Sequence, residues 1–239
     1  MSDPVLSVVI PAFNEERIIG KTLRRFSRYL RHLPYVCEII LVDDGSTDAT
    51  VSIARSVAAE SPVPMRIIGR PANRGKGFSV REGVLASNGQ FILFSDADSS
   101  APITEWRKLE PWLREGYDVA IGSRYAPGHR IRVPQPWFRV LAGRGFRWMI
   151  QCMTGLPFLD TQCGFKAFAA PAAHAMFERQ RVDRFAFDVE VLCLAQRMRH
   201  RVKEVGVRWN AGRESKVRML RDGPRMLWDV WQMRTRLGA

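Results

Sequence analysis

The amino-acid sequence predicts an α/β fold built on a mostly parallel sheet with helices on both faces. The chain has 239 residues and a hydrophobic fraction of 46%, which is ample for a packed core. In its first half, short apolar segments alternate with segments of helical periodicity. The short segments are apolar at nearly every position, as is typical of parallel strands that are covered on both sides.

Strands and helices alternate up to about residue 122. The strands are predicted at residues 6–10, 37–42, 65–69, 91–95 and 119–122. The helices between them are predicted at residues 15–33, 47–59, 77–86 and 104–113. From about residue 127 a stretch rich in proline, arginine and aromatic residues follows. After it we expect an apolar segment at 163–165, helices from 171 and at 185–198, and a strand at 202–209.

The composition limits the partners and the cellular compartment. The formal net charge of +13 comes almost entirely from arginine, which fits nucleic acid, anionic lipid or a phosphorylated substrate. No apolar run reaches the roughly 18 residues of a membrane span, and the N-terminus does not resemble a signal peptide, so we expect neither secretion nor a spanning segment. The four cysteines have no paired spacing, which predicts core residues in a reducing cytosol and neither disulfides nor zinc.

Polar residues follow four of the predicted strands directly. They are Pro11 to Glu15, Asp43 to Ser46, Asp96 to Asp98, and Ser123 with Arg124. Because parallel sheets bind ligands at the carboxyl ends of their strands, we expect these four segments to meet at one crevice.

Asp96 and Asp98 form the most informative of these segments. Alternate residues of an extended segment point the same way, so both carboxylates can face the crevice, one toward a nucleoside and the other toward a divalent cation. A cap on the following helix is the alternative interpretation. Asp43, the last residue of its strand, is placed to accept hydrogen bonds from a base or ribose, whereas Ser46 or Thr47 is expected to cap the next helix.

The turn at residues 73–77, which contains Lys76, leads into a helix. Its glycines and basic side chains suit a position near a diphosphate, although the spacing is not that of a P-loop. A solvated turn is the alternative.

Two stretches of the second half are amphipathic at helical pitch. In the first, the apolar arc contains Trp137, Phe138, Leu141, Trp148, Met149 and Met153, and the polar arc contains Arg139, Arg144, Arg147 and Gln151. In the second, after Pro224, the apolar residues are Met226, Leu227, Val230, Trp231 and Met233, opposed by Arg225, Gln232 and Arg236. Tryptophan and arginine on such helices favour a membrane interface, and a helix that faces the core is the alternative.

Eight motifs carry a resemblance to a known family. The first half contains VVIPAFNEE at 8–16, VDDGSTD at 42–48, NRGKG at 73–77 and DAD at 96–98; the second contains GSR at 122–124, DTQCGFK at 160–166, FAFDVE at 185–190, and Trp209 followed by SK at 215–216. The first four resemble the donor half of family 2 inverting glycosyltransferases of GT-A fold. The second four resemble the polyprenyl-phosphate sugar transferases, and within them the dolichyl-phosphate glucosyltransferases.

The resemblance implies a role for each matching residue. Around the nucleoside it places Pro11, Phe13, Glu15, Leu41, Asp43, Asp96 and Ala97, with Lys76 near the diphosphate. Asp98 falls to the metal, Mg²⁺ or Mn²⁺, and Arg124 and Lys216 face the phosphates of donor or acceptor. Asp160 and Gln162 hold sugar hydroxyls or organise the acceptor side. Asp188 lies near the sugar, and because Asp188 and Glu190 do not share a helix face, one of the two is expected to be exposed or structural.

The implied reaction is the inverting transfer of a hexose, glucose from UDP-glucose, to the phosphate of a polyprenol or dolichol. Asn210 stands where mannosyl-transferring relatives carry arginine, which favours glucose, and Phe13 stands where many members have tyrosine. The alternatives are a GDP-mannose-dependent polyprenyl-phosphate mannosyltransferase, a transferase with a soluble acceptor, and a non-catalytic module that binds anionic lipid or nucleic acid. No nucleic-acid motif accompanies the charge, so no nucleic-acid partner is expected.

The domain organisation follows from the same comparison. We expect residues 1–239 to form a single glycosyltransferase domain with a nucleotide-sugar-binding half at 6–125, an acceptor half at 126–216 and an amphipathic C-terminal helix at 217–239. The protein is expected to be cytoplasmic and peripheral on the cytoplasmic face of a membrane, and the sequence leaves an oligomer open.

Overall fold

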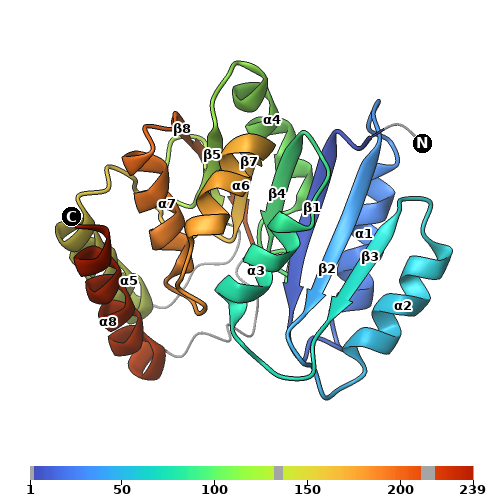
Figure 1. The fold of residues 1–239 in the computed structure, drawn as a ribbon, viewed down its shortest axis with the longest axis horizontal. Coiled ribbons are helices and arrows are strands. Elements are labelled where there is room, and N and C mark those ends of the chain that lie inside the picture. Colours follow the sequence, from blue (N-terminus) through green and yellow to red (C-terminus); the bar gives the residue numbers. More distant parts are fainter. Residues whose placement is uncertain (1–2, 132–136, 211–218, 239) are drawn as a thin grey trace.

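The computed structural model describes residues 3–131, 137–210 and 219–238, and the side chains of 137–142 and 219–221 lie outside the description. Its centre is a seven-stranded sheet of order β3-β2-β1-β4-β7-β5-β8 with helices on both faces (Figure 1). The α/β prediction is confirmed.

The strands of the first half lie close to their predicted positions. The main sheet contains β1 (Leu6–Ala12), β2 (Cys37–Asp43), β3 (Met65–Gly69), β4 (Phe91–Ser95), β5 (Val119–Ser123), β7 (Phe165–Ala169) and β8 (Val202–Gly206). All neighbouring pairs are parallel except those of β7, which is inserted antiparallel between β4 and β5. The chain therefore brings the second half of the sequence into the middle of the sheet.

The strand predicted at 202–209 is two strands. β8 ends at Gly206, and β9 (Arg208–Trp209) pairs with β6 (Arg130–Ile131) in a separate two-stranded sheet. The buried Val207 between them accepts a hydrogen bond from the Arg130 amide and donates one to the Ser123 carbonyl. These bonds redirect the chain, and the apolar pattern of the segment does not reveal them.

Two hydrophobic clusters cover the two faces of the sheet. Alternation along the buried strands sends Val8 and Ile10 to one face and Val9 to the other. One cluster includes side chains of α1 (Ile19–Leu30), α2 (Thr50–Glu60) and α4 (Trp106–Arg114), the last entered through the short 3-10 helix η1 (Ile103–Glu105).

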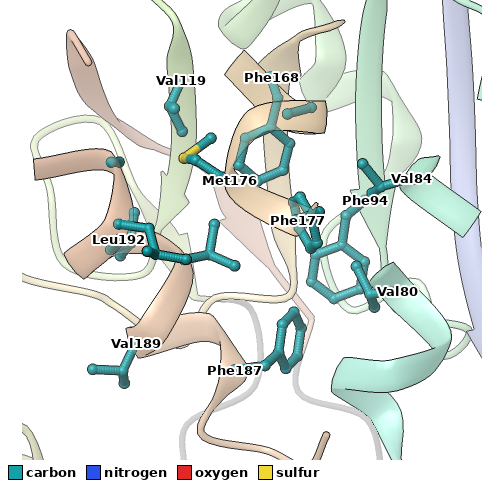
Figure 2. Close-up of a cluster of buried hydrophobic side chains, with 14 of the residues drawn as sticks. Val80, Val84, Phe94, Val119, Phe168, Met176, Phe177, Phe187, Val189 and Leu192 are labelled. Carbon is teal, nitrogen blue, oxygen red and sulfur yellow. The ribbon is translucent and has the colours of Figure 1, made fainter. Parts of the chain in front are cut away.

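The other cluster includes side chains of α3 (Lys76–Leu85), α6 (Ala170–Arg179) and α7 (Phe187–Arg197). Figure 2 shows Phe94 of β4 beside Phe187 of α7, with ring centroids 5.7 Å apart, and Val80 of α3 close by. This contact fixes the start of α7 against the end of β4.

Helices α5 (Trp137–Thr154) and α8 (Met219–Leu237) pack together at the end of the molecule beyond α7 (Figure 1). Four residues of these helices are buried in the core: Ile150 of α5 and Met226, Val230 and Met233 of α8. This part of each helix therefore packs against the core, which was the alternative to a membrane interface. α8 begins at Met219, close to the start of the C-terminal helix expected at 217–239, and Pro224 lies inside it. No helix in the described part of the chain is long and apolar enough to cross a bilayer.

The same two helices also expose large apolar side chains. Trp148 is 66% exposed, Trp228 55% and Trp231 49%, and Met149, which follows Trp148 in the chain, is 37% exposed. Trp228 and Trp231 stack with ring centroids 4.9 Å apart. We call Trp148, Met149, Trp228 and Trp231 the tryptophan surface. The predicted apolar arcs are therefore divided: one part packs inward and the other faces outward.

Candidate active site

The loops after β1 and β2 are joined into one structure. The Asn14 amide donates to the Ser46 hydroxyl (2.8 Å), and the Thr47 amide donates to the Asn14 side-chain oxygen (2.9 Å). Asn14 adopts a positive φ of 51° to make this connection. Helix α2 begins only at Thr50, where Asp48 accepts from the Thr50 amide, so the prediction that Ser46 or Thr47 caps this helix is wrong.

Asp43 ends β2 with one carboxylate oxygen hydrogen-bonded and the other without a partner in the described part of the chain. Oδ2 accepts from the Ser46 amide (3.0 Å), whereas Oδ1 is buried without a hydrogen-bond partner among the described residues. A buried carboxylate oxygen without a donor is costly unless a ligand supplies one. Of the other residues predicted for the nucleoside, Leu41 and Pro11 are buried, and Phe13 is 37% exposed at the surface of the loop.

The turn before α3 is held by a residue that the sequence reasoning did not select for this role. The Asp44 carboxylate accepts from the amides of Arg74 (2.9 Å) and Gly75 (2.8 Å). Gly75 has a φ of 113°, which a residue with a side chain rarely adopts. The second aspartate of the motif thus fixes the turn that carries Lys76.

Lys76 reaches the end of β4 and pairs with Asp96. Its Nζ lies 2.7 Å from Asp96 Oδ1 and above the ring of Phe94. Burial alone would lower the pKa of the Lys76 ammonium, but the charges of Asp96 and Asp188 outweigh it and the pKa lies above the usual value. The solvated turn given as the alternative is therefore wrong for Lys76.

Asp96 and Asp98 lie in one tight turn, in which the Ser99 amide donates to the Asp96 carbonyl (3.0 Å), and not on an extended segment as predicted. The Asp96 carboxylate lies directly over Gly164, where any side chain would overlap it, and the Ala97 carbonyl accepts from Thr22 (2.7 Å). Asp98 is exposed, and its two oxygens accept from the amide (2.9 Å) and hydroxyl (2.8 Å) of Ser100. Loss of hydration and the nearby Asp96 charge raise the pKa of Asp98.

These carboxylates fit a hard divalent cation. Each Asp98 oxygen accepts one hydrogen bond from Ser100, and carboxylate oxygens are the ligands that Mg²⁺ and Mn²⁺ prefer. Within the described ranges, no group of three or more His, Cys, Asp or Glu side chains forms a complete metal cage. A metal at Asp98 would therefore take its other ligands from water or from substrate phosphates, which is the usual arrangement for Mg²⁺.

Arg124 and Asp160 form an ion pair at the carboxyl end of β5. Asp160, 1% exposed, accepts from the Arg124 Nε (2.7 Å), Nη2 (2.8 Å) and backbone amide (2.9 Å). Burial alone would raise the pKa of Asp160, but Arg124 holds it below the usual value, and the pKa of Arg124 is raised in turn. In this structure Asp160 orients an arginine and has little capacity left for sugar hydroxyls.

Asp188 and Glu190 are both buried. Asp188 pairs with Lys166, a lysine only 1% exposed in β7, and Lys166 also donates to the Cys163 carbonyl (2.6 Å). Glu190 accepts from the amides of Arg181 (2.9 Å) and Val182 (2.7 Å) and pairs with Arg236 of α8. Glu190 thus has the structural role that the sequence reasoning allowed for one of the two acids.

The remaining predicted residues are placed as follows. Gln162 is half-buried, and its Nε2 has no hydrogen-bond partner among the described residues. Lys216 lies outside the described residues. Three of the cysteines are buried as predicted, but Cys152 is exposed on α5 because the helix turns it away from Ile150.

The seven-stranded sheet and the helices that cover it define the class of protein, a GT-A-like fold. The crystal structure of glucosyl-3-phosphoglycerate synthase from Mycobacterium tuberculosis with Mn²⁺, UDP and glucosyl-3-phosphoglycerate superposes with a TM-score of 0.70 over 98% of this chain and 80% of that one, at 21% identity. The complex of the same enzyme with Mn²⁺, UDP-glucose and phosphoglyceric acid gives a TM-score of 0.69 over the same shares, at 20% identity.

The chain belongs to glycosyl transferase family 2, whose model matches residues 7–169, and it is a glycosyltransferase. It is 35% identical over 218 residues to dolichyl-phosphate beta-glucosyltransferase of Drosophila melanogaster, covering 85% of this chain and 66% of the relative. Identity to the human enzyme of that name is 34%, covering 89% and 69%, and to that of Dictyostelium discoideum 32%, covering 97% and 74%. The predicted family is confirmed.

Proposed function

We propose that this protein transfers glucose from UDP-glucose to the phosphate of a polyprenyl or dolichyl phosphate. The observation that carries the proposal is the position of Asp43, Asp96, Asp98 and Arg124 at the carboxyl ends of the parallel strands β2, β4 and β5, in a chain about one third identical to dolichyl-phosphate beta-glucosyltransferases. A single in-line displacement inverts the anomeric centre, so the α-linked donor gives a β-linked lipid phosphate.

On the donor side, the open oxygen of Asp43 accepts a hydrogen bond from the base or ribose, with Pro11, Phe13, Glu15 and the backbone near Leu41 around it. Asp96 and Ala97 border the ribose and the diphosphate. Lys76, already held at Asp96, supplies positive charge next to the diphosphate.

Asp98 holds the divalent cation together with the diphosphate of the donor. Such a cation neutralises the charge that builds on the departing UDP. Ser100 fixes both oxygens of Asp98 beforehand, so that this carboxylate needs little rearrangement when the donor binds.

On the acceptor side, Arg124 and Lys216 hold the phosphate in line with the anomeric carbon. A phosphate monoester has a second pKa of about 6 and is largely a dianion at neutral pH, so the reaction requires little general-base assistance. Asp160 keeps Arg124 in place, Gln162 offers an unpaired amide, and Asp188 lies near the sugar.

The tryptophan surface supports a peripheral position on a membrane, which we propose to be on the cytoplasmic face. Indole rings favour the headgroup region, and the exposed Arg225 and Arg144 on the same helices suit lipid phosphates. A peripheral position of this kind brings the acceptor phosphate to the protein without a spanning helix.

The proposal is tested with labelled UDP-glucose, Mn²⁺ and a polyprenyl phosphate in detergent. We expect a labelled lipid that extracts into organic solvent, no product after chelation of the metal, and a loss of at least about a hundredfold in Asp98→Ala. Glu178→Ala, which removes an exposed acid from α6, is the matched control. Equal labelling from GDP-mannose would contradict the glucose assignment, and full activity of Asp98→Ala would contradict the role of that residue.

A further inference from the structure

Arg147 of α5 lies against the loop that carries Arg124. Its guanidinium carbon is 3.6 Å from the centre of the Tyr125 ring, and its Nη1 donates to the Leu159 carbonyl (3.3 Å). Leu159 directly precedes Asp160, the partner of Arg124. The sequence pattern placed Arg147 on the polar arc of α5, but the structure turns it toward the site.

Arg147 and Arg124 share one aromatic ring. The Arg124 guanidinium carbon lies 5.6 Å from the centre of the Tyr125 ring and 5.1 Å from the centre of the Trp209 ring. Two guanidinium groups held near the same ring repel each other unless an anion lies between or beside them. The Tyr125 ring thus lies beside two positive charges, of which Asp160 holds that of Arg124 in place.

The two arginines differ in their acidic partners. Asp160 takes two side-chain hydrogen bonds from Arg124. Arg147 has no carboxylate within ion-pair distance in the part of the chain that the structure describes, and its Nε is buried there without an acceptor. A buried donor on an uncompensated charge is costly, and an anionic ligand would remove the cost.

The chemistry of this pair fits a phosphate monoester. A planar guanidinium binds phosphate through two parallel N–H donors, and a dianion offers enough oxygens for two arginines. Trp148, the next residue of α5, is exposed on the tryptophan surface. A phosphate bound at Arg147 would therefore lie next to the surface from which its lipid chain arrives.

We infer that Arg147, together with Arg124, binds the phosphate of the acceptor lipid. The inference rests on the proposed function, because it names a residue for the acceptor of that reaction. The Tyr125 ring packs against the Arg147 guanidinium. Helix α5 carries both Arg147 and Trp148, and so connects the phosphate site to the tryptophan surface.

The test is equilibrium binding of a polyprenyl phosphate in nonionic detergent micelles, without donor and without phospholipid. We expect Arg147→Met to weaken binding by about tenfold to a hundredfold, the range of one charge-assisted interaction. Arg147→Lys keeps the positive charge but loses the two parallel N–H donors of the guanidinium. Its affinity for the polyprenyl phosphate should lie between those of Arg147→Met and the wild type. The unphosphorylated polyprenol should bind the wild type and Arg147→Met equally.

Two controls separate ligand binding from loss of structure. Arg201→Met removes a comparable arginine, which lies 4.4 Å from the centre of the Tyr117 ring, at the amino ends of β5 and β8 and away from the carboxyl end that carries Arg124, and should leave binding unchanged. Mn²⁺-dependent UDP binding should be the same in all variants, since the donor groups are untouched.

If Arg147→Met binds polyprenyl phosphate as tightly as the wild type, the inference is wrong. The contact between Arg147 and Tyr125 would then serve only the packing of α5. Weaker binding to anionic phospholipid vesicles with unchanged affinity in micelles would also overturn the inference, because the ligand would then be a headgroup. These outcomes do not depend on glucose transfer: a wild type that binds lipid phosphate through Arg147 but transfers no glucose would leave the inference standing and contradict the proposed function.

Discussion

Asp160 shows how a buried carboxylate can serve a site through another residue. Its side chain is almost completely enclosed, and three donors of Arg124 meet it. Arg124 is thereby held at the end of β5, with its Nε and Nη2 bound to Asp160. A guanidinium that is oriented before the ligand arrives loses less entropy on binding.

The pair also predicts a pH dependence of stability. Because the pKa of Asp160 is lower in the folded protein than in the unfolded chain, the carboxylate stabilises the fold above its ordinary pKa, and this contribution is lost as pH falls through the folded value. Asp160→Asn should lower the free energy of unfolding by about 3 kcal/mol at pH 7. The loss should shrink below about pH 4.

Denaturant titrations from pH 3 to pH 7 measure this difference. Glu60→Gln, which removes an exposed charge at the end of α2, should give a curve close to the wild type. A difference between Asp160→Asn and wild type that stays constant over the whole pH range would contradict the assigned cause.

Some site residues could be predicted from sequence and others could not. Asp96, Asp98 and Arg124 follow apolar strands directly, and position alone sends them to the carboxyl edge. The partners of these residues come from distant segments, so spacing gives no signal for them. Lys166 is the exception, since a lysine inside the apolar strand β7 indicates a buried partner, which the structure identifies as Asp188.

At the scale of elements, α5 and α8 differ most from their predicted form. Periodicity predicted one apolar face on each, whereas each helix has an inward apolar side and an exposed aromatic side. Sequence cannot separate the two because the side that packs depends on α7 and the end of the sheet. The Arg236–Glu190 pair, which joins α8 to α7, fixes that rotation.

The tryptophan surface predicts a measurable membrane affinity. Replacing Trp228 and Trp231 by serine should reduce the partition coefficient onto anionic vesicles by at least about tenfold, because two large apolar side chains lose their contact with lipid. Vesicle flotation measures the bound fraction. Val36→Ser, at an exposed apolar position before β2, should have no effect.

An unchanged vesicle-bound fraction after replacement of both Trp228 and Trp231 by serine would contradict this prediction. A fall of the same size in Val36→Ser would also count against it, since the loss would then not belong to the tryptophan surface.

At the scale of the whole molecule, the order of strands decides where the chemistry lies. The parallel strands of the first half could be predicted because each is largely apolar and polar residues directly follow four of the five. The antiparallel β7 could not, since nothing local shows that residues 165–169 enter between β4 and β5. That insertion brings Gly164 under Asp96 and Lys166 beside Asp188, and so joins the donor and acceptor sides.

The most direct test of this account is the structure of the product that the purified protein makes from UDP-glucose and a polyprenyl phosphate. Mass spectrometry and proton NMR of the extracted lipid report its composition and its anomeric configuration. The account predicts a single hexose joined through phosphate to the polyprenol, with the β configuration of glucose. An α-linked product, or glucose found only on water-soluble molecules, would contradict it.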